Sequence, residues 1–158
     1  MKKKFIFGRL QFNLPARILI FIFVAYPAST YADTLPLLNL KIRGAEISAE
    51  VAAIPATRAQ GLMYRKQLAK NQGMLFIFPE PDYYSMWMLN TYIPLSVAFL
   101  DKQGVILNIA DMAPLTKESH GAIAPAKFAL EMNLGWFKAH NIKAGDQVLG
   151  LLQAPRGL

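Results

Sequence analysis

The sequence predicts a mainly β (α+β) fold: a compact antiparallel sandwich or jelly-roll-like barrel of about seven strands with two short helices. Short runs that alternate apolar and polar residues, or are apolar throughout, recur along the chain. No long helical pattern separates them, as it would in a parallel βαβ sheet. The 158 residues, of which 54% are hydrophobic, suffice for one core and not for two. We therefore expect a single folded domain.

The predicted strands differ in how far they are covered. Residues 38–42 and 46–51 alternate apolar and polar side chains around Gly44, which indicates a hairpin with one face in solvent. Residues 73–78 and 97–100 are apolar throughout, as in strands covered on both faces. Gly104 suits a hairpin turn into the strand that follows. In chain order, the seven predicted strands are residues 38–42, 46–51, 73–78, 97–100, 105–109, 128–132 and 147–152.

Two short helices are predicted between these strands. Pro55 suits a first helical position, and residues 56–64 carry apolar side chains at helical spacing. The second helix is expected over residues 135–141, where Trp136 and Phe137 lie within one short turn.

The first 32 residues predict a secretory signal peptide. A basic start is followed by an apolar run at residues 18–24 and by small residues up to Ala32, where we expect cleavage. The uninterrupted apolar stretch is too short to cross a bilayer, which needs about 20 residues. The interpretation is a periplasmic or secreted protein without stable membrane insertion after cleavage, and the alternative is a membrane anchor formed by an uncleaved signal segment. The folded domain would then be residues 33–158, with a core at about residues 38–152.

Charge and the lack of Cys exclude several function classes. The formal net charge is +7, but five basic residues lie in the first 17 positions, and residues 33–158 hold 12 basic and 10 acidic residues. The basic excess therefore does not indicate nucleic-acid binding. The chain has no Cys, so it has no disulfide, thiol nucleophile or thiolate metal site.

Six segments of the chain are similar to one known family. The chain resembles the domain of unknown function 192 family over about residues 38–152, and the order and spacing of the segments make the resemblance specific. It implies a compact β-rich domain, often exported, whose molecular activity is unknown. The segments are Gly61-Leu-Met-Tyr-Arg65, Gly73-Met-Leu-Phe-Ile-Phe78, Met86-Trp-Met-Leu-Asn-Thr-Tyr-Ile-Pro-Leu95, Ala98-Phe-Leu-Asp101, Ala129-Leu-Glu-Met-Asn-Leu-Gly135 and Gly145-Asp146.

The chain departs from the family pattern at two polar positions. Leu89 stands where members usually have Lys, and Ser96 stands where they usually have Asp. The start of the first helix, usually Thr-Pro-x-Glu-Arg, is Ile-Pro-Ala-Thr-Arg at residues 54–58. An activity that required that Lys or that Asp would be lost in this chain.

The candidate site is a groove lined by Trp87, Asn90, Thr91 and Glu131. If residues 83–91 form a strand, Trp87 and Thr91 share one face and Asn90 lies on the other. An exposed Trp could stack on a ligand ring, although large aromatics more often fill cores. Residues 112–127, which hold two prolines and no regular pattern, are expected to form a loop that walls the groove or passively crosses between sheet edges.

Glu131 lies in an otherwise apolar strand and must face solvent or find a partner. Arg65 or Arg58 could pair with it and clamp helix to sheet, and Arg65 is included among the candidate ligand-binding residues. In the catalytic alternative, Glu131 acts as an acid or base with Asp101 or Asp111, which requires the two carboxylates to face one cleft within about 5 to 9.5 Å.

Metal and cofactor chemistry is not predicted. His120 and His140 are the only imidazoles, and they lack the spacing of a metal-binding motif. No triad signature and no phosphate-binding glycine loop occurs.

The sequence therefore predicts an exported binding or accessory domain, with a small molecule or an envelope protein as its partner. The alternatives are an acid/base hydrolase of a glycan or envelope substrate, and a purely structural component of an envelope complex.

Overall fold

A computed structural model describes residues 35–158, so the predicted signal peptide lies outside the described residues. The described part begins with a hairpin of β1 (Leu37–Ile42) and β2 (Ala45–Ala52), which confirms the first predicted pair of strands. Arg43 and Gly44 form the turn with positive φ angles of 48° and 89°. Two left-handed residues in a two-residue turn match the twist of a hairpin.

A crossover then places β3 beside β2. The chain passes through α1 (Pro55–Gln60) and returns as β3 (Gln72–Asp82), which pairs with β2 in parallel. This is the one parallel pair in the described sheet, and the other pairs are antiparallel. A parallel connection needs a crossover of this kind because a tight turn reverses the chain.

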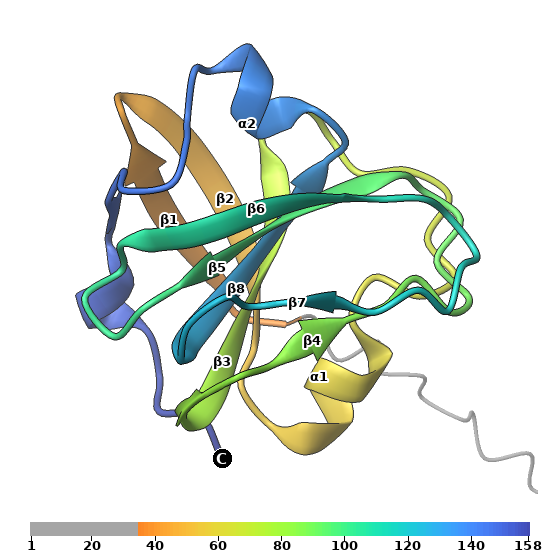
Figure 1. The fold of residues 1–158 in the computed structure, drawn as a ribbon, viewed down its shortest axis with the longest axis horizontal. Helices are drawn as coiled ribbons and strands as arrows, with labels where there is room; N and C mark the ends of the chain where they lie inside the picture. Colours follow the sequence, from red (N-terminus) through yellow and green to blue (C-terminus); the bar gives the residue numbers. More distant parts are fainter. Residues whose placement is uncertain (1–34) are drawn as a thin grey trace, which may run out of the picture. The chain divides into compact units, whose positions relative to one another are not determined.

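The remaining strands complete a curled seven-stranded sheet, seen in Figure 1. They are β5 (Leu95–Leu100), β6 (Ile106–Met112), β8 (Ala126–Asn133) and β9 (Val148–Leu149). The strand order is β6-β5-β8-β3-β2-β1-β9, so β8 lies in the interior between β5 and β3. The prediction of a mainly β fold with two short helices is confirmed.

Smaller elements cover the two sides of this sheet. A ribbon of β4 (Ser85–Met86) and β7 (His120–Gly121) lies with α1 on one side, and α2 (Trp136–Ala139) lies on the other (Figure 1). Within residues 35–158, no helix is long and apolar enough to span a bilayer.

The last predicted strand, residues 147–152, is wrong in its extent. Only Val148–Leu149 pairs with β1, and the chain then forms the 3-10 helix η1 (Leu151–Gln153). Gly150 causes the change, because its φ is +100° and a Cβ there would lie 2.5 Å from the carbonyl oxygen of Asn39. A strand cannot continue through that conformation.

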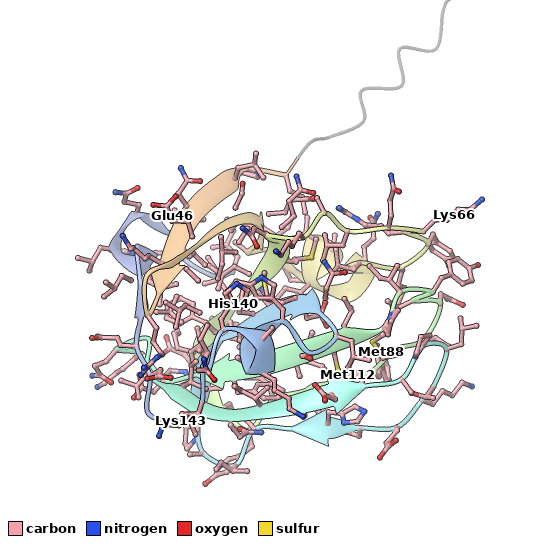
Figure 2. All side chains as sticks on the ribbon, turned by 90° about the horizontal axis from the view of Figure 1, so that it is seen from above. Glu46, Lys66, Met88, Met112, His140 and Lys143 are labelled. Carbon is pink, nitrogen blue, oxygen red and sulfur yellow. The ribbon has the colours of Figure 1, made fainter. Side chains whose placement is uncertain are left out.

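Two apolar clusters fill the two sides of the sheet. We call the side covered by α2 the α2 face, and its cluster includes Leu40, Leu75, Leu130, Trp136 and Phe137. We call the side covered by α1 and the β4–β7 ribbon the α1 face, and its cluster includes Leu62, Met74, Phe76, Met88, Val97 and Met112. Figure 2 labels Met88 and Met112, which both belong to the second cluster.

Candidate functional site

A pocket of about 340 Å³ opens on the α1 face. Its walls come from α1 and the turn after it, from β3, and from the segment around β4, and its base includes a residue of β8. We call it the α1–β4 pocket. Its lining residues are Arg58, Ala59, Gln60, Gly61, Leu62, Met63, Phe76, Phe78, Pro79, Tyr84, Ser85, Met86, Trp87, Thr91 and Glu131.

Glu131 is the one acidic residue of this lining. It lies near the middle of β8, opposite Met74 of β3 and Val97 of β5, and both of these neighbours belong to the apolar cluster of the α1 face. Only 3% of its surface is exposed. Burial raises the pKa of Glu131 from 4.5 to about 8, because a charged carboxylate is unfavourable in apolar surroundings. The carboxyl group is therefore mostly protonated at neutral pH.

Neither predicted arginine partner reaches Glu131. Arg65 forms a two-pronged ion pair with Glu50, in which its Nη2 lies 2.6 Å from Oε2, and this hydrogen bond raises the pKa of Arg65. Arg58 donates to the carbonyl oxygens of Ala53, Ile77 and Leu158. The predicted clamp from arginine to Glu131 is thus replaced by two separate contacts, one from α1 through Arg58 and one from the loop after α1 to β2 through Arg65. Arg65 does not line the pocket.

Trp87 forms part of the pocket wall and is 60% exposed. The strand alternation considered for residues 83–91 is wrong outside Ser85–Met86, because β4 spans only these two residues and a turn follows at residues 89–90. Trp87 is therefore not part of the core, since the strand β4 ends at the residue before it. The exposed indole is free to stack on a ligand.

Thr91 and Asn90, both predicted to line the groove, have different positions relative to the pocket. Thr91 is buried and lines the pocket, whereas Asn90 does not line it. Asn90 has a left-handed φ of 57°, donates from Nδ2 to the hydroxyl of Tyr64, and accepts from the Tyr64 amide. Its role here is to hold two loops together.

The predicted loop wall, residues 112–127, does not line the pocket. β7 pairs instead with β4, and the amides of Met88 and Leu115 bond to the carbonyl oxygens of Thr116 and Thr91. The loop therefore supports the wall segment from behind.

Sequence reasoning missed most of the aromatic wall. Phe76, Phe78 and Tyr84 line the pocket, and Phe78 and Tyr84 stack with ring centroids 3.7 Å apart. The apolar run at residues 73–78 was predicted to be covered on both faces, and such a run does not distinguish a core wall from a pocket wall. Tyr84, placed before Trp87 in the same segment, was the available signal.

The structure does not bring the three candidate catalytic carboxylates together. Asp111 accepts a hydrogen bond from Ser96, which pairs with Met132 and belongs to the α2 face, opposite to Glu131. Asp101 accepts from the amides of Gln103 and Val105 in the β5–β6 turn, four residues along β5 from the partner of Glu131. At about 3.3 Å per residue, that is roughly 13 Å. The one-cleft geometry needed by an acid/base hydrolase is absent from the described residues.

The two histidines do not form a metal centre in the described part of the chain, where no group of three metal-ligating residues occurs. His140 Nδ1 lies 2.8 Å from the carbonyl oxygen of Trp136, and its ring packs on the Trp136 ring. His120 pairs with Met86 in the β4–β7 ribbon, and its Nε2 is buried without a hydrogen-bond partner.

A larger hollow of about 760 Å³ lies on the α2 face beside Asp111. Its lining includes the exposed charged side chains of Arg43, Lys138 and Lys143. Small-molecule sites are typically apolar with a few convergent polar groups. The α1–β4 pocket fits that description better than this charged hollow does.

Solved structures with the same fold include two bacterial proteins. One, from Sinorhizobium meliloti and described as a candidate transcription regulator, is 33% identical with a TM-score of 0.72, covering 74% of this chain and 95% of that one. The other, from Novosphingobium aromaticivorans, is described as a protein of unknown function. It is 32% identical with a TM-score of 0.68, and the match covers 79% of this chain and 93% of that one.

Among curated proteins, none matches the chain significantly. Residues 38–150 match the family DUF192, described as an uncharacterized ACR. The match covers well over half of the chain, and it includes the segments around α1, β3, β4 and β8 that form the pocket. The resemblance seen in the sequence is thereby confirmed, and the chain belongs to the domain of unknown function 192 family.

Proposed function

We propose that the chain is an exported binding or accessory domain that holds a small ligand in the α1–β4 pocket. The observation that carries the proposal is the buried Glu131 carboxyl at the base of a mostly apolar pocket. Burial of a carboxyl group among apolar side chains is costly, so a fold that keeps one in the lining of a pocket is a candidate binding site. Export rests on the secretory signal predicted in residues 1–32.

The pocket residues would make different kinds of contact with the ligand. Trp87, exposed on the wall, supplies a ring face for stacking, and Phe76 and Phe78 supply apolar contact area. Glu131 and Thr91 supply polar groups that would fix the orientation of the ligand.

Native mass spectrometry tests this proposal. The protein is purified from the exported fraction of cells that express the full-length chain, and its native mass is compared with its denatured mass. We expect an excess mass that is lost on denaturation. The denatured mass also reports whether cleavage occurs after Ala32.

A pair of aromatic variants makes the test specific. Trp87→Ala removes an exposed ring from the pocket wall, whereas Tyr83→Ala removes a similarly exposed ring that does not line the pocket. We expect Trp87→Ala to lose most of the bound mass and Tyr83→Ala to keep it. A folded Trp87→Ala protein with undiminished bound mass would contradict the proposal.

A second candidate function is favoured by exposed apolar side chains near the pocket. Tyr64, Tyr92 and Leu115 are each at least half exposed, and hydrogen bonds join their loops through Asn90 and Thr91. Exposed apolar groups gathered in this way suit an envelope protein partner. No excess native mass, together with a crosslink from this loop cluster to one envelope protein, would favour this function over ligand binding.

A further inference from the structure

The charge environment of the α1–β4 pocket narrows the chemistry of its ligand. Glu131 has apolar neighbours on both adjacent strands, Met74 and Val97, and both predicted arginine partners are engaged elsewhere. Burial therefore acts on this carboxyl without an opposing cation. What the site lacks is a positive charge close to Glu131.

The one cation of the pocket lining does not supply that charge. Arg58 donates through Nη1 to the carbonyl oxygens of Ala53 and Ile77 and through Nη2 to that of Leu158, at 2.6 to 3.0 Å. Three hydrogen bonds thus hold its guanidinium to main-chain acceptors. An anionic ligand would compete with these acceptors for Arg58 and would meet a buried acid at the base of the pocket.

The pocket walls suit a cation. The lining includes the aromatic rings of Phe76, Phe78, Tyr84 and Trp87. The faces of such rings attract ammonium groups, most strongly where water is excluded. Apolar walls with several rings and one acid at the base favour a ligand with an apolar body and one positive charge.

We propose that the ligand of the α1–β4 pocket is an organic cation, an ammonium group on an apolar body, with the Glu131 carboxylate as its counter-ion. This inference rests on the proposed ligand-binding function. The binding step moves one proton: the O–H bond of the Glu131 carboxyl breaks, its proton passes to solvent, and the carboxylate pairs with the ammonium group. A neutral or anionic ligand would not drive this ionisation.

Binding is then linked to pH through Glu131. Below about pH 8 the empty pocket holds the proton, so the affinity for a cation rises about tenfold per pH unit and levels off above that pH. One proton is released per cation bound at about pH 6, and about half a proton at about pH 8.

Few other titratable groups face this carboxyl. β3 and β5 present apolar residues opposite it, α1 presents Arg58, and the wall segment presents Tyr84, whose hydroxyl donates to the carbonyl oxygen of Glu80. His120 of β7 lies beside Met86 and does not line the pocket. A His120→Gln variant separates the contribution of this imidazole from that of Glu131.

Three small molecules with one phenyl group each test the proposal by isothermal titration. They are 2-phenylethylamine, 2-phenylethanol and 3-phenylpropionate, which carry an ammonium, a hydroxyl and a carboxylate group. The exported protein is titrated from about pH 6 to pH 9 in buffers of different ionisation enthalpy, which report proton release. We expect the amine to bind at least about tenfold more tightly than the other two at about pH 8, with the proton release given above.

Matched variants assign the effect to one carboxyl. Glu131→Gln keeps the size of the side chain and is expected to abolish the proton release and the preference for the amine. Glu46→Gln makes the same change at an exposed position of β2 and is expected to alter neither. His120→Gln is expected to keep the rise in affinity between about pH 7 and pH 8.

The outcomes separate this inference from the proposed function. Tighter binding of the alcohol or the carboxylate than of the amine would overturn the cation inference and would support the pocket as a binding site. Amine binding that is independent of pH and unchanged in Glu131→Gln would also overturn it. If none of the three binds, the cation inference fails, and the native mass comparison alone decides the proposed function.

Discussion

The two faces of the sheet differ in the surroundings of their buried polar groups. On the α2 face, the Ser96 hydroxyl donates to Asp111 and accepts from the amide of Gly135, so the buried polar atoms at its rim have partners. On the α1 face, Glu131 is buried against apolar side chains at the base of a pocket. A satisfied polar network stabilises a face, whereas a buried carboxyl that lines a pocket is available to a ligand. Under the proposed function, the α1 face is the one that binds the ligand, and the polar groups of the α2 face contribute to stability.

Two neighbouring residues of β8 carry this contrast. Leu130 is fully buried in the α2-face cluster, and Glu131, the next residue, faces the α1 side. Because side chains alternate along a strand, two adjacent residues point to opposite faces of the sheet. A substitution at Leu130 therefore tests the α2 face, and a substitution at Glu131 tests the α1 face.

The largest expected effect is a loss of stability with rising pH. The folded pKa of Glu131 is about 8 against 4.5 unfolded, so between these values the unfolded chain has released a proton that the folded chain keeps. The free energy of unfolding therefore falls by about 1.4 kcal/mol per pH unit, or about 4 kcal/mol from pH 5 to pH 8. Urea denaturation of the wild type and of Glu131→Gln measures this contribution as the difference between their pH profiles. Parallel profiles would contradict it.

Leu130→Ala tests the other face. Deleting a fully buried leucine side chain is expected to lower the free energy of unfolding by about 3 kcal/mol, because the cavity refills only partly. Urea denaturation should show the same loss at each pH. A loss below about 1 kcal/mol would mean that the α2 face is loosely packed. Leu152→Ala, at a fully exposed position, serves as the control.

Ser96→Ala is expected to cost about 1 to 2 kcal/mol of unfolding free energy, since it removes hydrogen bonds to Asp111 and Gly135 at a buried site. The bound mass should be unchanged, because Ser96 does not line the α1–β4 pocket. The matched control is Ser119→Ala, at an exposed position. Loss of ligand in Ser96→Ala with no change at Ser119 would break the assignment of function to the α1 face.

Arg65→Met is expected to have the smallest effect. The Arg65–Glu50 pair is partly exposed, with 34% and 23% of the two side chains accessible, so solvent screens its charges. We expect a loss of about 0.5 to 1 kcal/mol, which shrinks in about 1 M salt. The affinity for the ligand should stay the same. A large loss of affinity would return Arg65 to the binding site.

Most strands could be predicted because the pattern of apolar and polar residues that produces them lies within each segment. The alternation of residues 38–42 and 46–51 and the apolar run at 73–78 follow from which sides of each strand are covered. Residues 147–152 show where this fails, since the backbone at Gly150 depends on its contact with Asn39, which is distant in sequence. The chain at that end forms a 3-10 turn instead, in which Leu151 packs against the core and Leu152 is exposed.

The candidate site was predictable only in part because it is assembled from distant segments. Trp87, Thr91 and Glu131 meet in one pocket, while Asn90 and Arg65 point to other partners. The sequence marks Glu131 as an anomaly in an apolar strand, but it does not show that Glu50, rather than Glu131, pairs with Arg65. That choice depends on the β2–β3 register and on the crossover through α1.

The protonation of Glu131 tests the central claim most directly. The carboxyl carbon of Glu131 is followed by nuclear magnetic resonance while the pH is raised, in the purified protein freed of ligand and again with 2-phenylethylamine. The account predicts a midpoint near 8 in the empty pocket and a clearly lower midpoint with the amine. A midpoint near the ordinary value of 4.5 in the empty protein would show a solvated or paired carboxylate and would contradict the account.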